Sequence, residues 1–239
     1  MTACANIWIQ NSVQGDYRIF PLGDSALTVE FGTHISLELN EKALALAAYF
    51  EQHPFPGFIE AVPAYSSTTL FFDVGEVRAS SPDFPTAFDA VKHLAVNAEK
   101  TSKKVLQRSQ REVEIPVDFG KASAPDLAIV AEANALSSEN VIEIFIAARY
   151  RVFMLGFLPG FAYMGEVDDR IATPRRKTPR VTVPKGSVGI AGNQTGIYSL
   201  DSPGGWQIIG RTDVPMFISN AANPSLLQPG DTVRFVPVK

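Results

Sequence analysis

Residues 156–212 read GFLPGFAYMGEVDDRIATPRRKTPRVTVPKGSVGIAGNQTGIYSLDSPGGWQIIGRT, and this stretch decides the structural class of the C-terminal half. Short apolar runs alternate with proline and glycine, which exclude long helices at this frequency. Turn signals about every eight to twelve residues favour a β-barrel or a β-sandwich. The interruptions, which extend beyond the quoted stretch, are Pro159-Gly160, Pro174, Pro179, Pro184, Lys185-Gly186, Gly192-Asn193, Pro203-Gly204-Gly205 and Pro229-Gly230-Asp231.

Two helices and a strand precede this stretch. Residues 112–117 alternate as a strand. The run from Ser123 to Asp126 has the spacing of a capping box with proline in the first turn, so a helix is expected to begin there. A second helix is expected over residues 138–149. Residues 106–239 are therefore predicted to form an all-β barrel domain with two leading helices.

The first hundred residues show a different pattern, in which strand and helix signals alternate. Residues 27–31 alternate with period two, and residues 58–62 and 68–72 are further apolar strand segments. One helical stripe runs from Leu39 to Phe50 and another from Phe84 to Ala95. The order strand-strand-helix-strand-strand-helix predicts, for residues 1–105, an α+β domain with helices on one face of an open sheet, a ferredoxin-like layer.

Bulk composition limits the classes of partner. The net charge of −4 argues against nucleic-acid binding, which needs a strongly basic face. The most apolar stretch, residues 141–158, carries Glu143, Arg149 and Arg151, which argues against a membrane span. The first fifteen residues do not have the pattern of a signal peptide, and Cys4 is the only cysteine. A cytoplasmic protein is expected.

Metal binding is not expected. The three histidines, His34, His53 and His93, have no metal-ligand spacing and no cysteine nearby. All three lie in the predicted N-terminal domain, far in sequence from Ser187, which therefore lacks a neighbouring base. Ser187 is expected to act as a hydrogen-bonding pocket residue rather than as a nucleophile, and no catalytic residue is assigned.

Ordered motifs run through most of the chain. They are Gly23–Leu27, Glu30–Gly32, Val62–Tyr65, Gly156–Tyr163, Thr173–Arg176, Pro179–Arg180, Val183–Gly192, Gln194–Tyr198, Ser202–Trp206 and Ile209–Thr212. In these motifs the sequence resembles the family of the 5-oxoprolinase B subunit, KipI and allophanate hydrolase subunit 1. One departure is Phe145, which stands where the family commonly has histidine.

The resemblance implies a cyclophilin-like barrel behind an α/β N-terminal domain. It also implies a subunit of ATP-dependent 5-oxoprolinase, which hydrolyses 5-oxo-L-proline to L-glutamate with partner subunits A and C. We expect ATP to be used by the complex, with its site mainly on a partner, and the isolated chain to be inactive. The alternative that the family implies is a protein-binding inhibitor of sensor histidine kinase autophosphorylation. A urea-pathway role is suggested only by the family's naming.

The basic segment from Arg170 to Lys185 is the strongest candidate for substrate binding. Arginine suits bidentate capture of a carboxylate, although these side chains could instead pair with local acids such as Asp168 and Asp169. Aromatic and polar residues that flank the predicted turns could line a pocket, or could serve packing and turn geometry. The substrate-binding candidates are Arg175, Arg180, Ser187, Gln194, Thr195, Tyr198, Trp206 and Arg211.

Three aromatic residues are candidates for a partner surface. Phe157, Phe161 and Tyr163 surround a Pro-Gly turn, and aromatic residues concentrate in the hot spots of interfaces. The alternative is that these side chains fill the core.

Overall fold

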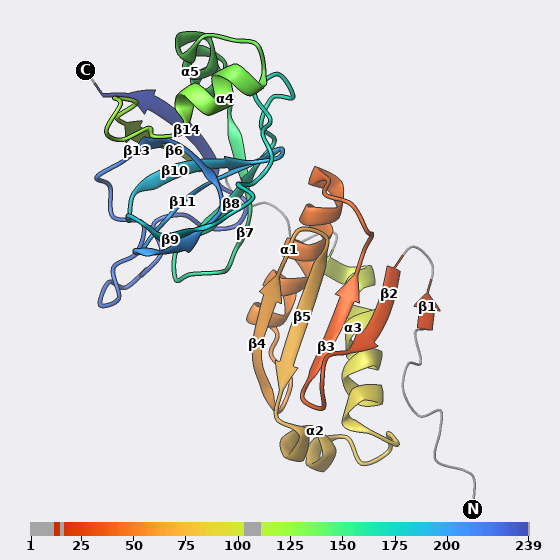
Figure 1. Ribbon diagram of the computed structural model, residues 1–239. Coiled ribbons are helices and arrows are strands. Elements are labelled where there is room, and N and C mark those ends of the chain that lie inside the picture. The colour runs from red at the N-terminus through yellow and green to blue at the C-terminus, as the bar shows by residue number, and fades with distance from the viewer. Residues whose placement is uncertain (1–11, 15–16, 103–110, 239) are drawn as a thin grey trace, which may run out of the picture. The chain divides into compact units, whose positions relative to one another are not determined.

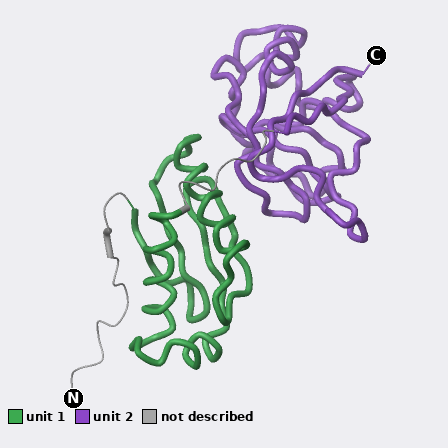
Figure 2. Tube along the Cα trace, turned by 180° about the vertical axis from the view of Figure 1, so that it is seen from behind, with its two compact units in different colours: residues 1–108 green, residues 109–239 purple. Residues whose placement is uncertain are grey.

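The computed structural model describes residues 12–14, 17–102 and 111–238. The chain divides into two compact units, Met1–Arg108 and Ser109–Lys239 (Figure 2). Cys4 and the predicted boundary between residues 105 and 106 lie outside the described residues, as does most of the segment inspected for a signal peptide. No helix in the described part of the chain combines the length and the apolar character needed to cross a membrane.

The N-terminal unit is one antiparallel sheet with helices packed on it (Figure 1). The strands lie in the order β1-β2-β3-β5-β4, and helices α1 and α3 contact each other and the sheet. Alternate residues of β3 and β5, such as Leu27, Val29, Leu70 and Phe72, are buried against the helices. The elements are β1 (Ser12–Gln14), β2 (Tyr17–Pro21), β3 (Ala26–Glu30), α1 (Leu37–Gln52), β4 (Phe58–Pro63), β5 (Ser67–Phe72), α2 (Val74–Ser80) and α3 (Ala87–Ser102).

The strand order confirms the small α/β class but does not confirm the ferredoxin-like layer. Strand β5 lies between β3 and β4, so β3, α1 and β4 form a split β-α-β unit. The other neighbour of β3 is β2, which precedes it in the chain. A ferredoxin-like layer would place there a strand that follows the second helix.

The C-terminal unit is a nearly closed β-barrel with two helices, as predicted. Its mixed sheet has seven strands in the order β13-β10-β11-β8-β7-β14-β6, with β14 and β6 parallel, and β12 pairs with β9. The elements are β6 (Glu112–Val117), α4 (Leu127–Ala133), α5 (Ser138–Ala147), β7 (Tyr150–Leu155), β8 (Ala162–Gly165), β9 (Arg180–Val183), β10 (Ser187–Ala191), β11 (Gln194–Ile197), β12 (Ser202–Gly204), β13 (Gln207–Arg211) and β14 (Thr232–Pro237).

A seam closes the barrel between the two edge strands. Asp118, which follows β6, pairs with Arg211 at the end of β13. The Asp118 N–H donates to the Arg211 carbonyl oxygen at 2.7 Å, and the Arg211 N–H donates to the Asp118 carbonyl oxygen at 2.9 Å. The edges of the sheet therefore satisfy each other's backbone groups at this point.

Phe145 belongs to the core of the C-terminal unit. Its ring is fully buried and stacks on Phe235 with a centroid distance of 4.8 Å. The Tyr150 hydroxyl donates to the Phe145 carbonyl oxygen at 2.8 Å. Where the family commonly has a histidine, this chain thus has a packing residue.

Candidate functional site

The predicted helix start at Ser123 is wrong, because the side chains of Ser123 and Asp126 bind groups outside the helix. Helix α4 begins at Leu127, and its N-cap residue Asp126 makes no side-chain capping bond. Ser123 donates its hydroxyl to Asp118 instead, at 2.5 Å. The Asp126 carboxylate points away from the helix and into the barrel unit, where it accepts the Ile208 N–H at 2.7 Å.

Asp126 forms ion pairs with two arginines of the basic segment. Its Oδ1 accepts from Arg176 Nη1 at 3.0 Å and from Arg180 Nη2 at 2.6 Å, and its side chain is 1% exposed. A carboxylate this deeply buried requires such charged partners. Arg180 is therefore held by an internal ion pair, with a partner 54 residues away in sequence.

The local acids that the sequence offered as partners bind other residues. Asp168 pairs with Arg170 at 2.7 Å, and the hydrogen bonds from Arg170 lower the pKa of Asp168 to about 2. Asp169 accepts from the Asn193 side chain at 2.7 Å. The alternative of pairing with these two acids therefore holds for Arg170 but not for Arg176 or Arg180.

The segment that carries the arginines is fastened to β13 and to the loop before it. The Arg176 N–H donates to the Gly205 carbonyl oxygen at 2.7 Å, and Gln207 Nε2 donates to the Pro174 carbonyl oxygen at 3.0 Å.

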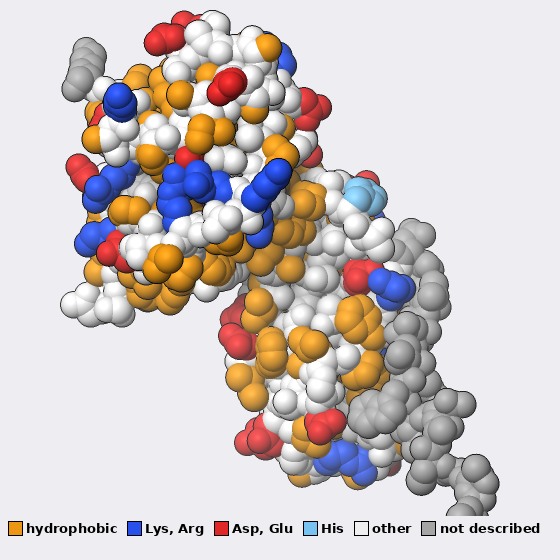
Figure 3. All heavy atoms as spheres, viewed as in Figure 1, with side chains coloured by type: hydrophobic (Ala, Val, Ile, Leu, Met, Phe, Trp, Pro, Cys, Tyr) orange, Lys and Arg blue, Asp and Glu red, His pale blue; other side chains and the backbone are white. Residues whose placement is uncertain are grey.

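Several Lys and Arg side chains gather on the face of the C-terminal unit that Figure 3 shows.

Arg175 lies against a cluster of aromatic rings. Its guanidinium carbon is 5.8 Å from the centre of the Trp206 ring, a distance typical of a cation–π contact. Tyr163 packs against Trp206 at 5.9 Å, and Phe161 lies 5.4 Å from Tyr198. Burial raises the pKa of Tyr163 and of Tyr198, and the nearby Arg175 works in the opposite direction on both. Most of the predicted aromatic candidates meet here.

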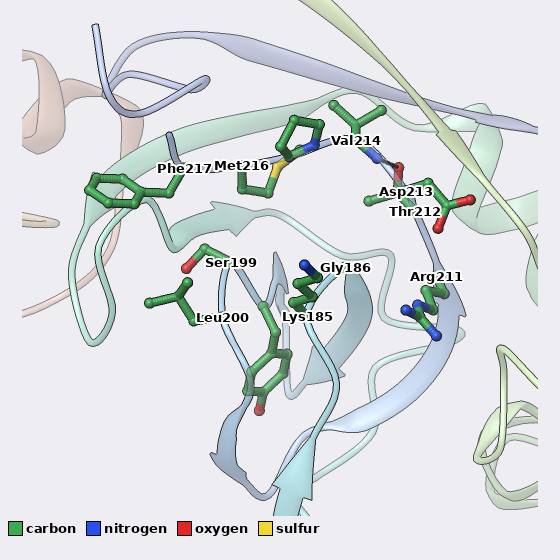
Figure 4. Close-up of a pocket in the computed structure, with 12 residues that line it drawn as sticks. Lys185, Gly186, Ser199, Leu200, Arg211, Thr212, Asp213, Val214, Met216 and Phe217 are labelled. Atoms are coloured by element: carbon green, nitrogen blue, oxygen red, sulfur yellow. Dashed lines mark hydrogen bonds between the residues drawn. The ribbon is translucent and has the colours of Figure 1, made fainter. Parts of the chain in front are cut away.

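Tyr198 also lines a pocket of about 170 Å³, which Figure 4 shows. Arg211, Thr212 and Asp213 stand on one side of it, and Ser199 and Leu200 on the other. The pocket is lined by Lys185, Gly186, Tyr198, Ser199, Leu200, Arg211, Thr212, Asp213, Val214, Pro215, Met216 and Phe217.

Backbone hydrogen bonds join the three chain segments of this pocket. The Gly186 N–H donates to the Tyr198 carbonyl oxygen at 2.7 Å, and the Thr212 N–H donates to the Gly186 carbonyl oxygen at 2.9 Å. The Lys185 N–H donates to the Asp201 carboxylate at 2.7 Å. Gly186 has a φ of 82°, and a β-carbon there would lie 2.0 Å from the Thr212 carbonyl oxygen. The walls of the pocket are thus fixed by the main chain.

The structure separates the remaining substrate-binding candidates. Only Arg211 and Tyr198 of that group line this pocket. Ser187 and Thr195 are buried in the sheet, where Thr195 donates to the Gly189 carbonyl oxygen at 2.9 Å, and Gln194 is half-buried at the start of β11. Their assignment to substrate binding stays a prediction.

Sequence reasoning missed several residues of these sites. The capping-box pattern places Asp126 in the first turn of a helix and gives no indication of its link to the arginines. Lys185 belonged to the basic segment, but its place beside Arg211 depends on the pairing of β10 with β13. Asp213, Ser199 and Met216 gave no sequence signal of their own.

The three partner-surface candidates differ in exposure. Phe161 is 1% exposed, Tyr163 is half-buried, and Phe157 is 59% exposed. Phe157 also has a φ of 67°, which bulky residues rarely adopt. Its ring meets Phe161 edge-on at 5.5 Å and Tyr198 at 6.4 Å. Phe157 is thus the most exposed member of the aromatic cluster.

Within the described ranges, no three His, Cys, Asp or Glu side chains come together in a way that could hold a metal ion.

Residues 17–227 match the family model described as carboxyltransferase domain, subdomain C and D. The chain is 45% identical over 223 residues to the 5-oxoprolinase B subunit of Bacillus subtilis (strain 168), which covers 93% of each chain. It is 39% identical over 222 residues to the 5-oxoprolinase B subunit of Escherichia coli O157:H7, covering 93% of this chain and 96% of that one.

Among solved structures, TTHA0988 superposes with a TM-score of 0.76 at 37% identity, over 90% of this chain. This chain spans 40% of the TTHA0988 chain. The resemblance noted in the sequence motifs is thereby confirmed, and the chain belongs to the carboxyltransferase subdomain C and D family, together with these B subunits of 5-oxoprolinase.

Proposed function

We propose that this chain is the B subunit of an ATP-dependent 5-oxoprolinase. The observation that carries the proposal is the 45% identity to a protein named as the B subunit of 5-oxoprolinase, along 93% of both chains. In the proposed complex the chain acts with subunits A and C to hydrolyse 5-oxo-L-proline to L-glutamate, and ATP is bound mainly by a partner.

The distribution of chemical groups supports a role that depends on partners. Ser187 is 3% exposed and lies in the C-terminal unit, whereas the three histidines of the chain belong to the N-terminal unit. The described residues of the barrel thus offer no Ser-His pair within one unit. The lactam amide of 5-oxoproline is stabilised by resonance, so ATP would provide the driving force, and we expect the isolated chain to be inactive.

Reconstitution tests this proposal. Glutamate release from 5-oxo-L-proline should require ATP, this chain and the A and C subunits of the same organism together, with background rates when any one chain is omitted. An assembled complex of all three chains that releases no glutamate would contradict the proposal. Inhibition of sensor histidine kinase autophosphorylation would then be the activity to assay.

We infer that Phe157 is an anchor for a partner subunit. A left-handed backbone conformation at a bulky residue costs about 1–3 kcal/mol and persists mostly at functional positions. At Phe157 the strained conformation leaves more than half of the aromatic residue exposed, at 59%. Exposed aromatic side chains of this kind are typical interface hot spots.

The variant Phe157→Asn separates assembly from folding. Asparagine tolerates positive φ, so the free energy of unfolding should stay within about 1 kcal/mol of the wild-type value. Affinity for the partner subunits, measured by surface plasmon resonance, should fall by about tenfold or more. Ile59→Thr, which removes an exposed apolar side chain from β4, serves as the matched control and should leave the affinity unchanged. Wild-type affinity in Phe157→Asn would remove this residue from the interface.

A further inference from the structure

Lys185 and Arg211 are two positively charged side chains of the barrel unit that lack an acidic partner within the described residues. Neither forms an ion pair with any residue that the structure describes. Arg176 and Arg180, by contrast, share an ion pair with Asp126, and Arg175 lies over Trp206. Both Lys185 and Arg211 line the pocket of Figure 4, so that pocket presents two positive charges that no ion pair within the described residues offsets.

We propose that this pocket binds a small organic monocarboxylate with a compact apolar body and an amide N–H, a class that includes 5-oxo-L-proline. Lys185 and Arg211 bind the carboxylate in this proposal, which rests on the proposed function and deepens it by selecting Arg211 from the predicted arginines and adding Lys185. Guanidinium groups bind carboxylates through two parallel hydrogen bonds.

The charge of the pocket favours a monoanion. Asp213 lines the pocket together with Lys185 and Arg211, so the three side chains carry a net charge of one positive unit. A triphosphate would bring several negative charges next to the Asp213 carboxylate. A carboxylate brings one, and Asp213 remains available to accept an amide N–H of the same ligand.

The shape of the pocket favours a compact ligand. Its volume of about 170 Å³ lies below the roughly 300–1,000 Å³ of sites for drug-sized ligands. Much of its wall is apolar and would contact ring methylenes, through Tyr198, Leu200, Val214, Pro215, Met216 and Phe217.

One buried hydroxyl in the wall has no partner. Ser199 is 7% exposed, and its Oγ forms no hydrogen bond within the described part of the chain. Buried hydroxyl groups in proteins are normally satisfied, because an unsatisfied one costs free energy. A polar group of the ligand would provide the missing hydrogen bond after rotation of the Ser199 side chain.

The pocket is also pre-organised. The main-chain hydrogen bonds that join Gly186 to Tyr198 and to Thr212 hold its three segments in place without a ligand. Rigid walls reduce the entropy lost on binding, which favours affinity for a small molecule.

Calorimetric titration of the full chain with 5-oxo-L-proline tests the pocket directly. Arg211→Met and Lys185→Met should each weaken binding by about tenfold or more, because a hydrogen-bonded charge is lost. Lys121→Met, at an exposed lysine of the same unit outside the pocket, is the matched control and should bind as the wild type does. Titration with 2-pyrrolidinone, which lacks the carboxylate, and with inorganic phosphate should give much weaker binding than 5-oxo-L-proline.

The assembled complex separates failure of the pocket from failure of the proposed function. In an active complex, Arg211→Met should raise the KM for 5-oxo-L-proline by about tenfold or more while leaving the KM for ATP unchanged. An active complex in which both pocket variants keep the wild-type KM and affinity would overturn the pocket and leave the proposed function standing. An inactive complex in which this chain binds 5-oxo-L-proline only with Lys185 and Arg211 intact would overturn the proposed function and leave the pocket standing. Tighter binding of phosphate than of 5-oxo-L-proline would also overturn the carboxylate assignment.

Discussion

Asp126→Ala is expected to lower the free energy of unfolding of the C-terminal unit by about 3 kcal/mol. The substitution leaves Arg176 and Arg180 without their anion and removes the acceptor of the Ile208 N–H. Loss of one partner from a buried pair usually costs about 3–5 kcal/mol, and the lower end applies because the two arginines are 32% and 23% exposed. Urea unfolding followed by Trp206 fluorescence, in a background with Trp8→Phe, measures the change.

Asp168→Ala is the control for this experiment. Asp168 also pairs with an arginine, but its partner Arg170 has a side chain that is 67% exposed, so solvent screens the pair. We expect no measurable change in the urea midpoint for this variant. Equal effects of the two substitutions would show that the burial of the Asp126 carboxylate contributes nothing to the free energy of unfolding.

Gly186→Ala is expected to destabilise the same unit by about 2–4 kcal/mol, from two sources that add. The φ of 82° is unfavourable for any residue with a β-carbon, and that atom would lie 2.0 Å from the Thr212 carbonyl oxygen. Relief of the clash requires the chain at residue 186 or at residue 212 to move, which disturbs two walls of the pocket. The unfolding free energy should fall, and affinity for 5-oxo-L-proline should fall with it.

Gly192→Ala separates the two sources. Gly192 has a φ of 60°, but a β-carbon there would meet no atom within 4 Å. This variant should show only the backbone cost, about 1 kcal/mol. If Gly186→Ala were no more destabilising than Gly192→Ala, the close approach to Thr212 would be energetically unimportant.

The sequence predicted the architecture of the second unit better than that of the first. Proline and glycine at short intervals between residues 156 and 230 leave a barrel or a sandwich as the only options, because they act on the backbone locally. The order of strands in the first unit depends on which edges pair across long intervals. Residues 17–21 were not assigned to a strand from the sequence, and it is this strand, β2, that takes the place beside β3.

The candidate site was predicted in part for the same reason. Residue type and motif singled out the arginines as a group, but they could not show which of them form ion pairs within the fold. That distinction depends on Asp126, whose carboxylate reaches the basic segment only after α4 has packed against β13. The presence of Lys185 and Arg211 in one pocket likewise follows from the register of β10 and β13, which pairs Ser187 with Arg211.

The seam of the barrel has a consequence for regulation by ligands. Arg211 closes the sheet through its main chain, by its reciprocal bonds with Asp118, and its side chain lines the pocket. A molecule that binds the Arg211 side chain therefore also restrains the backbone bridge between Arg211 and Asp118. By thermodynamic linkage, opening of that edge would weaken ligand binding. A ligand bound in the pocket would in turn stabilise the closed edge of the barrel.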